Sequence, residues 1–130
     1  MIARIIFAAT LASFASAAMN TPALAADVSG DAVAGRAIFQ RVCQNCHSPE
    51  IGINKVGPSL WNIVGRQAAS VPDFVYSEAM KSNKSIWSAS SLDAYLADPR
   101  GDVHGVKMFF KGLPEATDRA DVIAYLQTLK

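Results

Sequence analysis

The chain has 130 residues, enough for one hydrophobic core but not two. It is 51% hydrophobic with a formal net charge of +1, and much of the apolar share lies at its start, where Arg4 precedes an uncharged run from Ile5 to Ala18. A nearly neutral balance gives no argument for nucleic acid or for an anionic membrane surface as a partner.

Residues 1–25 have the pattern of a secretory signal peptide, because the apolar run is followed by a small-x-small site at Ala23-Leu24-Ala25. The run is shorter than the ~20 apolar residues that a membrane span needs. Cleavage near Ala25 would remove Arg4 and leave 11 basic against 11 acidic residues in a domain of residues 26–130. We therefore expect export to the periplasm and a monomeric product that does not span the membrane after cleavage.

Helical signals recur along the rest of the chain. The first helix is expected to start near Ser29-Gly-Asp31 and to run to about Cys43, where apolar residues have helical spacing, and a weaker one is expected around Tyr76–Lys81. A third helix is expected from the capping-box spacing of Ser90-Ser-Leu-Asp93 to Asp98-Pro99. The last is expected from just after Gly112-Leu-Pro114, with the proline at or near its first position, to the C-terminus.

No segment alternates like a β-strand, so the fold class predicted is all-α. The connecting segments are rich in Gly, Pro, Asn and Ser, and they cover Ile51–Ser59, Gly65–Asp73 and Arg100–Gly112. With about half of residues 26–130 in loops, the chain needs something besides its own side chains to pack against.

Both cysteines of the chain lie in Cys43-Gln-Asn-Cys46-His47. A thioredoxin-type dithiol needs a strand before the motif, and none is expected there. A structural zinc site needs four ligands, and His47 and His104 are the only histidines. A disulfide across so short a loop would add little stability and would leave His47 unexplained.

The pattern favours the remaining possibility, covalent haem c, one group held by thioethers through Cys43 and Cys46 with His47 on the iron. Such an iron has a second face, for which Met80, Met108 and His104 are the candidate ligands. Met108 lies in an irregular loop just before the last helix, from which a thioether can reach inward. A methionine can equally be filler of a hydrophobic core.

Further motifs follow in order along the chain. They are Gly30-Asp-Ala-Val-Ala-Gly35, Ile38-Phe39, Cys43–His47, Gly57-Pro58-Ser-Leu60, Gly65-Arg66, Phe74-Val-Tyr76, Trp87, Tyr95-Leu96, Lys107-Met108 and Ala124-Tyr125-Leu126. In these residues and their spacing, over nearly all of residues 26–130, the sequence resembles class I cytochrome c and within it the bacterial cytochrome c2 group. The resemblance implies three main helices plus one or two short ones, with long loops wrapped around one covalently bound haem.

The resemblance also implies roles for single residues. His47 corresponds to the proximal iron ligand and Met108 to the distal one, and the carbonyl of Pro58 would accept the proximal imidazole N–H. Other matching positions hold a haem propionate, namely Arg66, Tyr76 and Trp87. Tyr95 matches a tyrosine that bonds the methionine sulfur. Gly35, Phe39 and Tyr125 match the crossing of the first and last helices.

Three residues depart from the family pattern. Met80 replaces a common asparagine, Val106 a threonine that usually bonds a propionate, and His104 a frequent proline. We expect the distal side, where Met108 would bind, to be drier and to have fewer hydrogen bonds. We also expect the loop that carries Met108 (residues 104–112, the methionine loop) to be less restrained at its start. Burial and hydrogen bonding tune haem iron, so the reduction potential should be affected.

An iron with two protein ligands has no open position, which predicts an electron carrier and not an enzyme. We expect a soluble one-electron carrier between redox complexes, as in a respiratory chain. Transient docking at the haem edge would involve Lys55, Lys107 and Lys111, with Lys81 and Lys84 nearby. The alternatives are a subunit bound to a periplasmic dehydrogenase or oxidase, and a haem peroxidase or ligand sensor.

Overall fold

The computed structural model describes residues 29–130, so the predicted signal peptide lies outside the described residues. Five helices follow one another along the chain. They are α1 (Ala32–Val42), α2 (Glu78–Ser82), α3 (Ala89–Ala97), α4 (Pro99–Asp102) and α5 (Ala116–Gln127). Within the described residues the extended structure is limited to an isolated bridge between Gln67 and Ile86, so the all-α prediction is confirmed.

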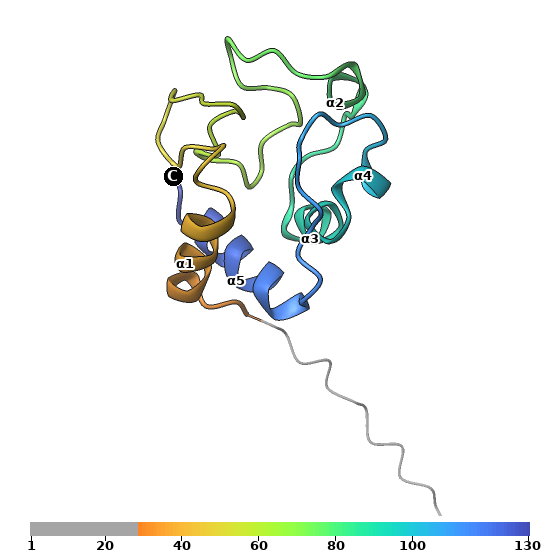
Figure 1. The fold of residues 1–130 in the computed structure, drawn as a ribbon. Helices are drawn as coiled ribbons and strands as arrows, with labels where there is room; N and C mark the ends of the chain where they lie inside the picture. Colours follow the sequence, from red (N-terminus) through yellow and green to blue (C-terminus); the bar gives the residue numbers. More distant parts are fainter. Residues whose placement is uncertain (1–28) are drawn as a thin grey trace, which may run out of the picture.

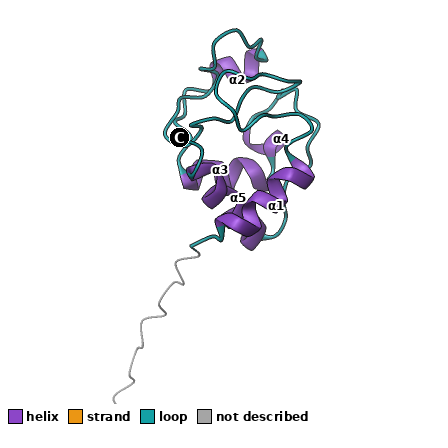
Figure 2. Cartoon of the chain, turned by 90° about the vertical axis from the view of Figure 1, so that its left-hand side faces the viewer, coloured by secondary structure: helices purple, strands orange, loops and turns teal. Residues whose placement is uncertain are grey.

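The helices α1, α3 and α5 gather at one end of the molecule, and the long loops with α2 occupy the other (Figures 1 and 2). Between residues 29 and 130 no helix has the length and apolar character to cross a bilayer. The core contains Ile38 and Phe39 of α1 and Val122 and Leu126 of α5, all buried. The loops are therefore built on a small helical base.

The base is the crossing of α1 and α5, which the resemblance to class I cytochrome c implies. A Cβ on Gly35 would collide with the backbone carbonyl of Asp121, so only glycine permits this approach. The rings of Phe39 and Tyr125 lie 5.2 Å apart between centroids. The N–H of Asp31 donates to a carboxylate oxygen of Asp121 at 2.7 Å and ties the start of α1 to α5.

The predicted start of α3 was wrong by two residues. Its capping box is formed by Ser88 and Ser91, where each side-chain oxygen accepts the other residue's backbone N–H. A serine takes the place that Glu or Gln has in the usual signature, and this hid the cap in the sequence. Asp93, assigned to the cap from sequence, instead forms an ion pair with Arg119.

Other helix boundaries also differ from the prediction. The weak helix after Tyr76 begins only at Glu78, because Ser77 caps it. Part of the expected loop 100–112 is the short helix α4, whose first residue is Pro99 and whose Gly101 N–H is accepted by the Asp98 side chain. The last helix begins at Ala116, two residues after Pro114, and ends at Gln127 before the C-terminus.

Candidate haem site

The Cys-x-x-Cys-His motif forms a turn at the end of α1. Cys43 is the C-cap of the helix, and its carbonyl accepts the N–H of Cys46 at 3.1 Å and that of His47 at 2.9 Å. Because the turn is closed by its own backbone, both thiols and the imidazole line the same cavity. The position of the motif at a helix end is the one predicted from sequence.

The imidazole of His47 is held on two sides. Its Nδ1 lies 2.8 Å from the carbonyl oxygen of Pro58, and because a carbonyl only accepts, Nδ1 carries the proton. Gly57 lies against the ring, where an added Cβ would be 2.7 Å from Nδ1 and 2.9 Å from Nε2. Nε2 is thereby left as the nitrogen able to bind a metal.

The environment favours the neutral form of this imidazole. Burial lowers the pKa of His47 from its ordinary value, and the Lys55 ammonium lowers it further against the opposing hydrogen bond to Pro58. A neutral imidazole is the form that ligates metals. Pro58 therefore fixes both the orientation and the tautomer of His47, as its sequence match implies.

The surroundings of Cys43 do not suit a redox-active dithiol. Burial, and to a smaller extent the nearby Cys46, raises the pKa of Cys43 to about 11. A reactive dithiol has a thiol with a lowered pKa, so Cys43 lacks the activation that a thioredoxin-type site requires. Among residues 29–130 no group of three or more His, Cys, Asp or Glu side chains is placed to hold a metal ion.

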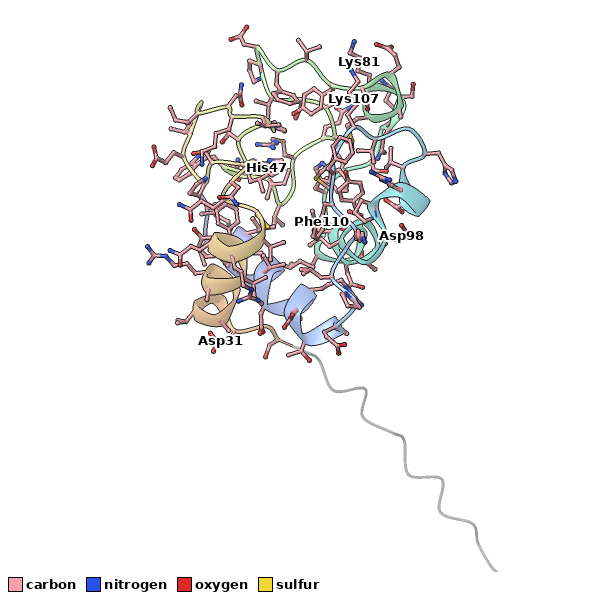
Figure 3. The ribbon with its side chains drawn as sticks, viewed as in Figure 1. Asp31, His47, Lys81, Asp98, Lys107 and Phe110 are labelled. Carbon is pink, nitrogen blue, oxygen red and sulfur yellow. The ribbon has the colours of Figure 1, made fainter. Side chains whose placement is uncertain are left out.

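A cavity of about 400 Å³ lies among the loops, lined mainly by apolar side chains. It brings together residues that are far apart in the sequence, and every predicted site residue lines it: Cys43, Cys46, His47, Pro58, Arg66, Tyr76, Trp87, Tyr95 and Met108. In Figure 3, His47 projects from the loop that follows α1 into the space among the loops. The volume and lining are those of a site for one large apolar ligand.

The Arg66 side chain on the wall of the cavity has a hydrogen-bond donor that an anionic group could satisfy. Arg66 donates from Nη2 to the carbonyl of Ser59 at 3.0 Å and from Nη1 to that of Trp61 at 2.5 Å, but its Nε is buried without a partner among the described residues. A buried donor of a charged group without an acceptor is costly. A haem propionate would supply the acceptor, so the residues present fit haem.

Aromatic side chains shape the same wall. The backbones of Trp87 and Arg66 are joined by a hydrogen bond of 2.9 Å, and the Trp87 ring lies 5.0 Å from that of Tyr95 between centroids. The Tyr76 hydroxyl accepts the Val71 N–H at 3.3 Å, and burial raises the pKa of Tyr76. The expected bond between Tyr95 and the Met108 sulfur stays a prediction.

Met80 and Val106, two of the departures, line the cavity, and neither side chain offers a hydrogen-bond donor there. This is the basis of the drier distal side expected from sequence. His104, the third, is exposed. At the start of the methionine loop, the Val103 N–H donates to the Pro99 carbonyl and the Val106 N–H to the Val103 carbonyl.

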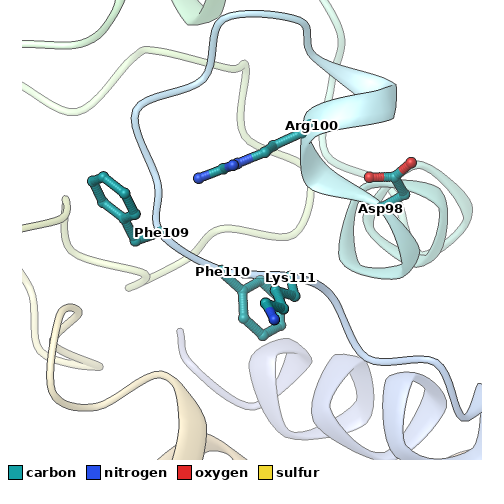
Figure 4. Close-up of a pocket in the computed structure, with 5 residues that line it drawn as sticks. All are labelled: Asp98, Arg100, Phe109, Phe110 and Lys111. Carbon is teal, nitrogen blue, oxygen red and sulfur yellow. The ribbon is translucent and has the colours of Figure 1, made fainter.

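The outer side of the methionine loop has a second hollow, of about 310 Å³, lined by Asp98, Arg100, Phe109, Phe110 and Lys111. Figure 4 shows Arg100 reaching from α4 towards Phe109, and its guanidinium carbon lies 5.6 Å from the ring centroid. Phe109 is 96% exposed although it follows Met108 directly. Met108 itself is half-buried and packs against the core.

Sequence reasoning missed two parts of this region. Gly57 belongs to the motif Gly57-Pro58-Ser-Leu60, but the motif did not predict its contact with the His47 ring, although a glycine directly before the ligand-orienting Pro58 could have indicated it. Arg119, which bonds the end of the methionine loop, was also missed. Its partners lie far away in sequence or are backbone carbonyls, so no local pattern marks it.

The described chain is helical, and its loops enclose an apolar cavity with a Cys-x-x-Cys-His turn and a methionine on its wall. These features define the class of proteins that bind haem c covalently. Comparison with known proteins names the family. The family model Cytochrome c matches residues 32–130, and the chain belongs to the cytochrome c family. It is an electron carrier that binds one haem c through Cys43 and Cys46, and it is not an enzyme.

Individual relatives agree with this assignment. The chain is 50% identical over 104 residues to the cytochrome c-type cyt cy of Rhodobacter capsulatus, covering 80% of this chain but only 52% of that protein. It is 44% identical over 101 residues to cytochrome c2 of Rhodopila globiformis, covering 78% and 95% of the two chains. The solved structure of cytochrome cH from Methylobacterium extorquens matches with a TM-score of 0.71 and 38% identity, over 76% of this chain and 99% of that one.

Proposed function

We propose that His47 and Met108 are the two axial ligands of the haem iron and that the protein is a soluble, exported one-electron carrier. The observation that carries the proposal is that both side chains line one apolar cavity, with His47 fixed by Pro58 so that Nε2 is free. Haem c, when bound, supplies the Fe(III)/Fe(II) couple. The side chains orient the group, exclude water from its faces and supply the charges around it.

Two methionines line the cavity, so a pair of matched variants tests the distal ligand. Met108→Leu should abolish the far-red absorption band that ferric haem shows with a methionine sulfur ligand, and the reduced protein should then bind CO. Met80→Leu should keep the band and remain closed to CO. The assignment of Met108 would be contradicted if Met80→Leu alone lost the band, or if both variants kept it.

Arg66, Tyr76 and Trp87 would hold a haem propionate in this proposal, and Tyr95 would support Met108. The unpartnered Nε of Arg66 supports the propionate role because it lacks an acceptor within the described chain. Met80 and Val106 add no donors to the distal side. The group would therefore be held by few hydrogen bonds and by a mostly apolar wall.

Transient docking of redox partners would occur at the mouth of the cavity. Val56, Val75 and Phe109 line the cavity and are 83%, 80% and 96% exposed, so they form an apolar rim. Lys55 and Lys107 are exposed beside this rim, and Lys111 is exposed next to the second hollow. An apolar centre with surrounding cations suits an acidic partner that must dissociate quickly.

The rate of oxidation by hexacyanoferrate(III), a small anion, tests the charge of this face. Lys107→Glu should slow the reaction, and most strongly at low salt, because electrostatic steering is screened by salt. Arg36→Glu makes the same change of charge on α1, away from the cavity lining, and should slow it much less. Equal slowing by both variants would indicate that only net charge matters.

Export and assembly need separate measurements. N-terminal sequencing of the protein from a periplasmic fraction should give a start near Ala26, as cleavage near Ala25 requires. Gel filtration from the native source should give a single small haem protein. Stable co-elution with a large dehydrogenase or oxidase would favour the alternative of a bound subunit.

A further inference from the structure

Arg119, near the start of α5, contacts the end of the loop that carries Met108. Its Nε donates to the carboxylate of Asp93 at 2.6 Å, and its Nη1 donates to the backbone carbonyls of Leu113 at 2.9 Å and Pro114 at 2.8 Å. The Arg119 side chain is 13% exposed and that of Asp93 is 49% exposed. One guanidinium therefore joins α3, α5 and the loop end.

Side chains of this loop pack against the core, among them Met108 and Phe110, but the loop has few backbone hydrogen bonds between its ends. Within residues 29–130, no backbone N–H of residues 107–112 donates a hydrogen bond to another residue. The next bonded N–H is that of Leu113, which donates to the Leu96 carbonyl at 2.8 Å. Met108 lies five residues before Leu113, so its position depends strongly on how this end is held.

The chain has little freedom at the anchored end. Gly112 has a φ of +104°, and an added Cβ would collide with the Ala97 carbonyl at the end of α3. Leu113 is buried. The loop therefore enters the helical base through one close-fitting point, and Arg119 closes that point from the side of α5.

Arginine suits this position because its planar fork can bond a carboxylate and carbonyls at once. Replacement by a side chain that reaches neither group would leave the Asp93 carboxylate and both carbonyls without this donor. Hydrogen bonds from charged donors are the stronger ones. Because an anchor at one loop end mainly affects opening of that loop, its loss should favour local opening over global unfolding.

We propose that Arg119, oriented by Asp93, is a positioning residue for Met108: it holds the end of the loop on the α3–α5 base and so keeps the sulfur in the cavity. The inference rests on the proposed ligation by Met108. Neither Arg119 nor Asp93 lines the cavity, so any effect of these residues on the iron must pass through the loop.

Imidazole titrated into the ferric holoprotein measures this restraint, because it can bind the iron only when Met108 leaves. Arg119→Gln should raise the imidazole association constant about tenfold, the loss of roughly one charge-assisted hydrogen bond. Arg119→Lys and Asp93→Asn should each raise it about threefold, because each keeps part of the network. The far-red absorption band should reappear when imidazole is removed.

Asp31→Ala is the control. It removes one carboxylate, as Asp93→Asn does, and it destabilises α1 by deleting its N-cap without touching the loop. It should lower the denaturant midpoint but change the imidazole constant less than about twofold, since the loop is untouched. An unchanged constant in Arg119→Gln, or an equal rise in Asp31→Ala, overturns the positioning role.

The two proposals fail in different ways. If the parent lacks the far-red band, or Met108→Leu retains it, ligation by Met108 is wrong and the positioning role falls with it. If the band behaves as expected but the Arg119 and Asp93 variants bind imidazole like the parent, the positioning role alone is wrong. Should Arg119→Gln not yield folded haem protein, Arg119→Lys and Asp93→Asn decide the question by the same criterion.

Discussion

Gly57→Ala should loosen the proximal imidazole, and the structure allows the effect to be worked out. The new Cβ would lie 2.7 Å from Nδ1 and 2.9 Å from Nε2 of His47, distances that real Cβ contacts essentially never show. The backbone at Gly57 is bonded on both sides, since its N–H donates to Cys46 at 2.8 Å and its carbonyl accepts from Lys55 at 2.9 Å. The ring must therefore move, and its bond to Pro58 is stretched or lost.

Opposing terms set the sign of the stability change. Removing a glycine stiffens the unfolded chain and stabilises by ~0.4–1 kcal/mol where the native backbone permits alanine. Gly57 is not among the residues with positive φ, so this gain applies. Overpacking costs ~1–3 kcal/mol, and the lost hydrogen bond costs about 1 kcal/mol. The net expectation is a loss of ~1–4 kcal/mol.

Guanidinium unfolding of the holoprotein and potentiometry measure the two consequences. The denaturant midpoint should fall, and the reduction potential should rise, because an imidazole without its Nδ1–H acceptor is a less basic ligand and stabilises Fe(III) less. Gly52→Ala is the control, since its added Cβ would meet nothing within 4 Å. Its φ of +71° makes alanine cost about 1 kcal/mol but should leave the potential unchanged.

The reasoning is refuted if Gly57→Ala proves as stable as the parent with an unchanged potential. Such a result would mean that the ring does not rest on Gly57 once haem is bound. A rise in potential in Gly52→Ala of the same size would refute it differently, by showing that any disturbance of this loop reaches the iron.

Three further predictions concern the core, a helix cap and the cavity charge. Phe39→Ala should lower the free energy of unfolding by ~3–5 kcal/mol, measured by denaturant titration, because the ring is 1% exposed and packs on Tyr125. Asp31→Ala should cost about 1 kcal/mol in the same assay, and Asp31→Asn should cost less, because asparagine also caps. Arg66→Gln should lower the reduction potential in a redox titration, since a half-buried positive charge on the wall of the cavity would favour the reduced iron, whereas a surface change such as Arg36→Gln should not.

The sequence was sufficient for the parts that depend on local chemistry. The Cys-x-x-Cys-His turn follows from its spacing, and the buried face of α5 follows from the helical period of Val122, Ile123 and Leu126. The crossing of α1 and α5 could be predicted only from the resemblance, because the sequence around Gly35 does not indicate which backbone carbonyl the glycine will contact. Cys43, Cys46 and His47 follow from the motif, and Met108 is one of three candidate ligands before any resemblance is considered. The other five site residues are found only as matches to the family, and the fold brings all nine to one cavity.

Two kinds of contact were missed from the sequence, a local helix cap and a contact between segments far apart in the chain. The serine pair that caps α3 was hidden because Ser91 takes the place of an acid, so Ser90 and Asp93 gave a false cap two residues later. The partnership of Asp93 and Arg119 spans 26 positions and has no periodic signal. The contact between Asp93 and Arg119 forms only after α3 and α5 have packed, so no pattern within one segment can predict it.

The two proposed ligands are restrained very differently. His47 belongs to a turn closed by its own backbone bonds, and its ring is bonded to Pro58 and rests on Gly57. Met108 lies in a stretch whose backbone N–H groups donate to no other residue between 29 and 130, so the backbone hydrogen bonds of its loop are at the loop ends. The free energy of local opening should therefore be lower on the methionine side, and the sulfur should be the ligand that leaves first. Contacts outside the cavity, foremost those of Arg119, would then set how well Met108 stays on the iron between one electron transfer and the next.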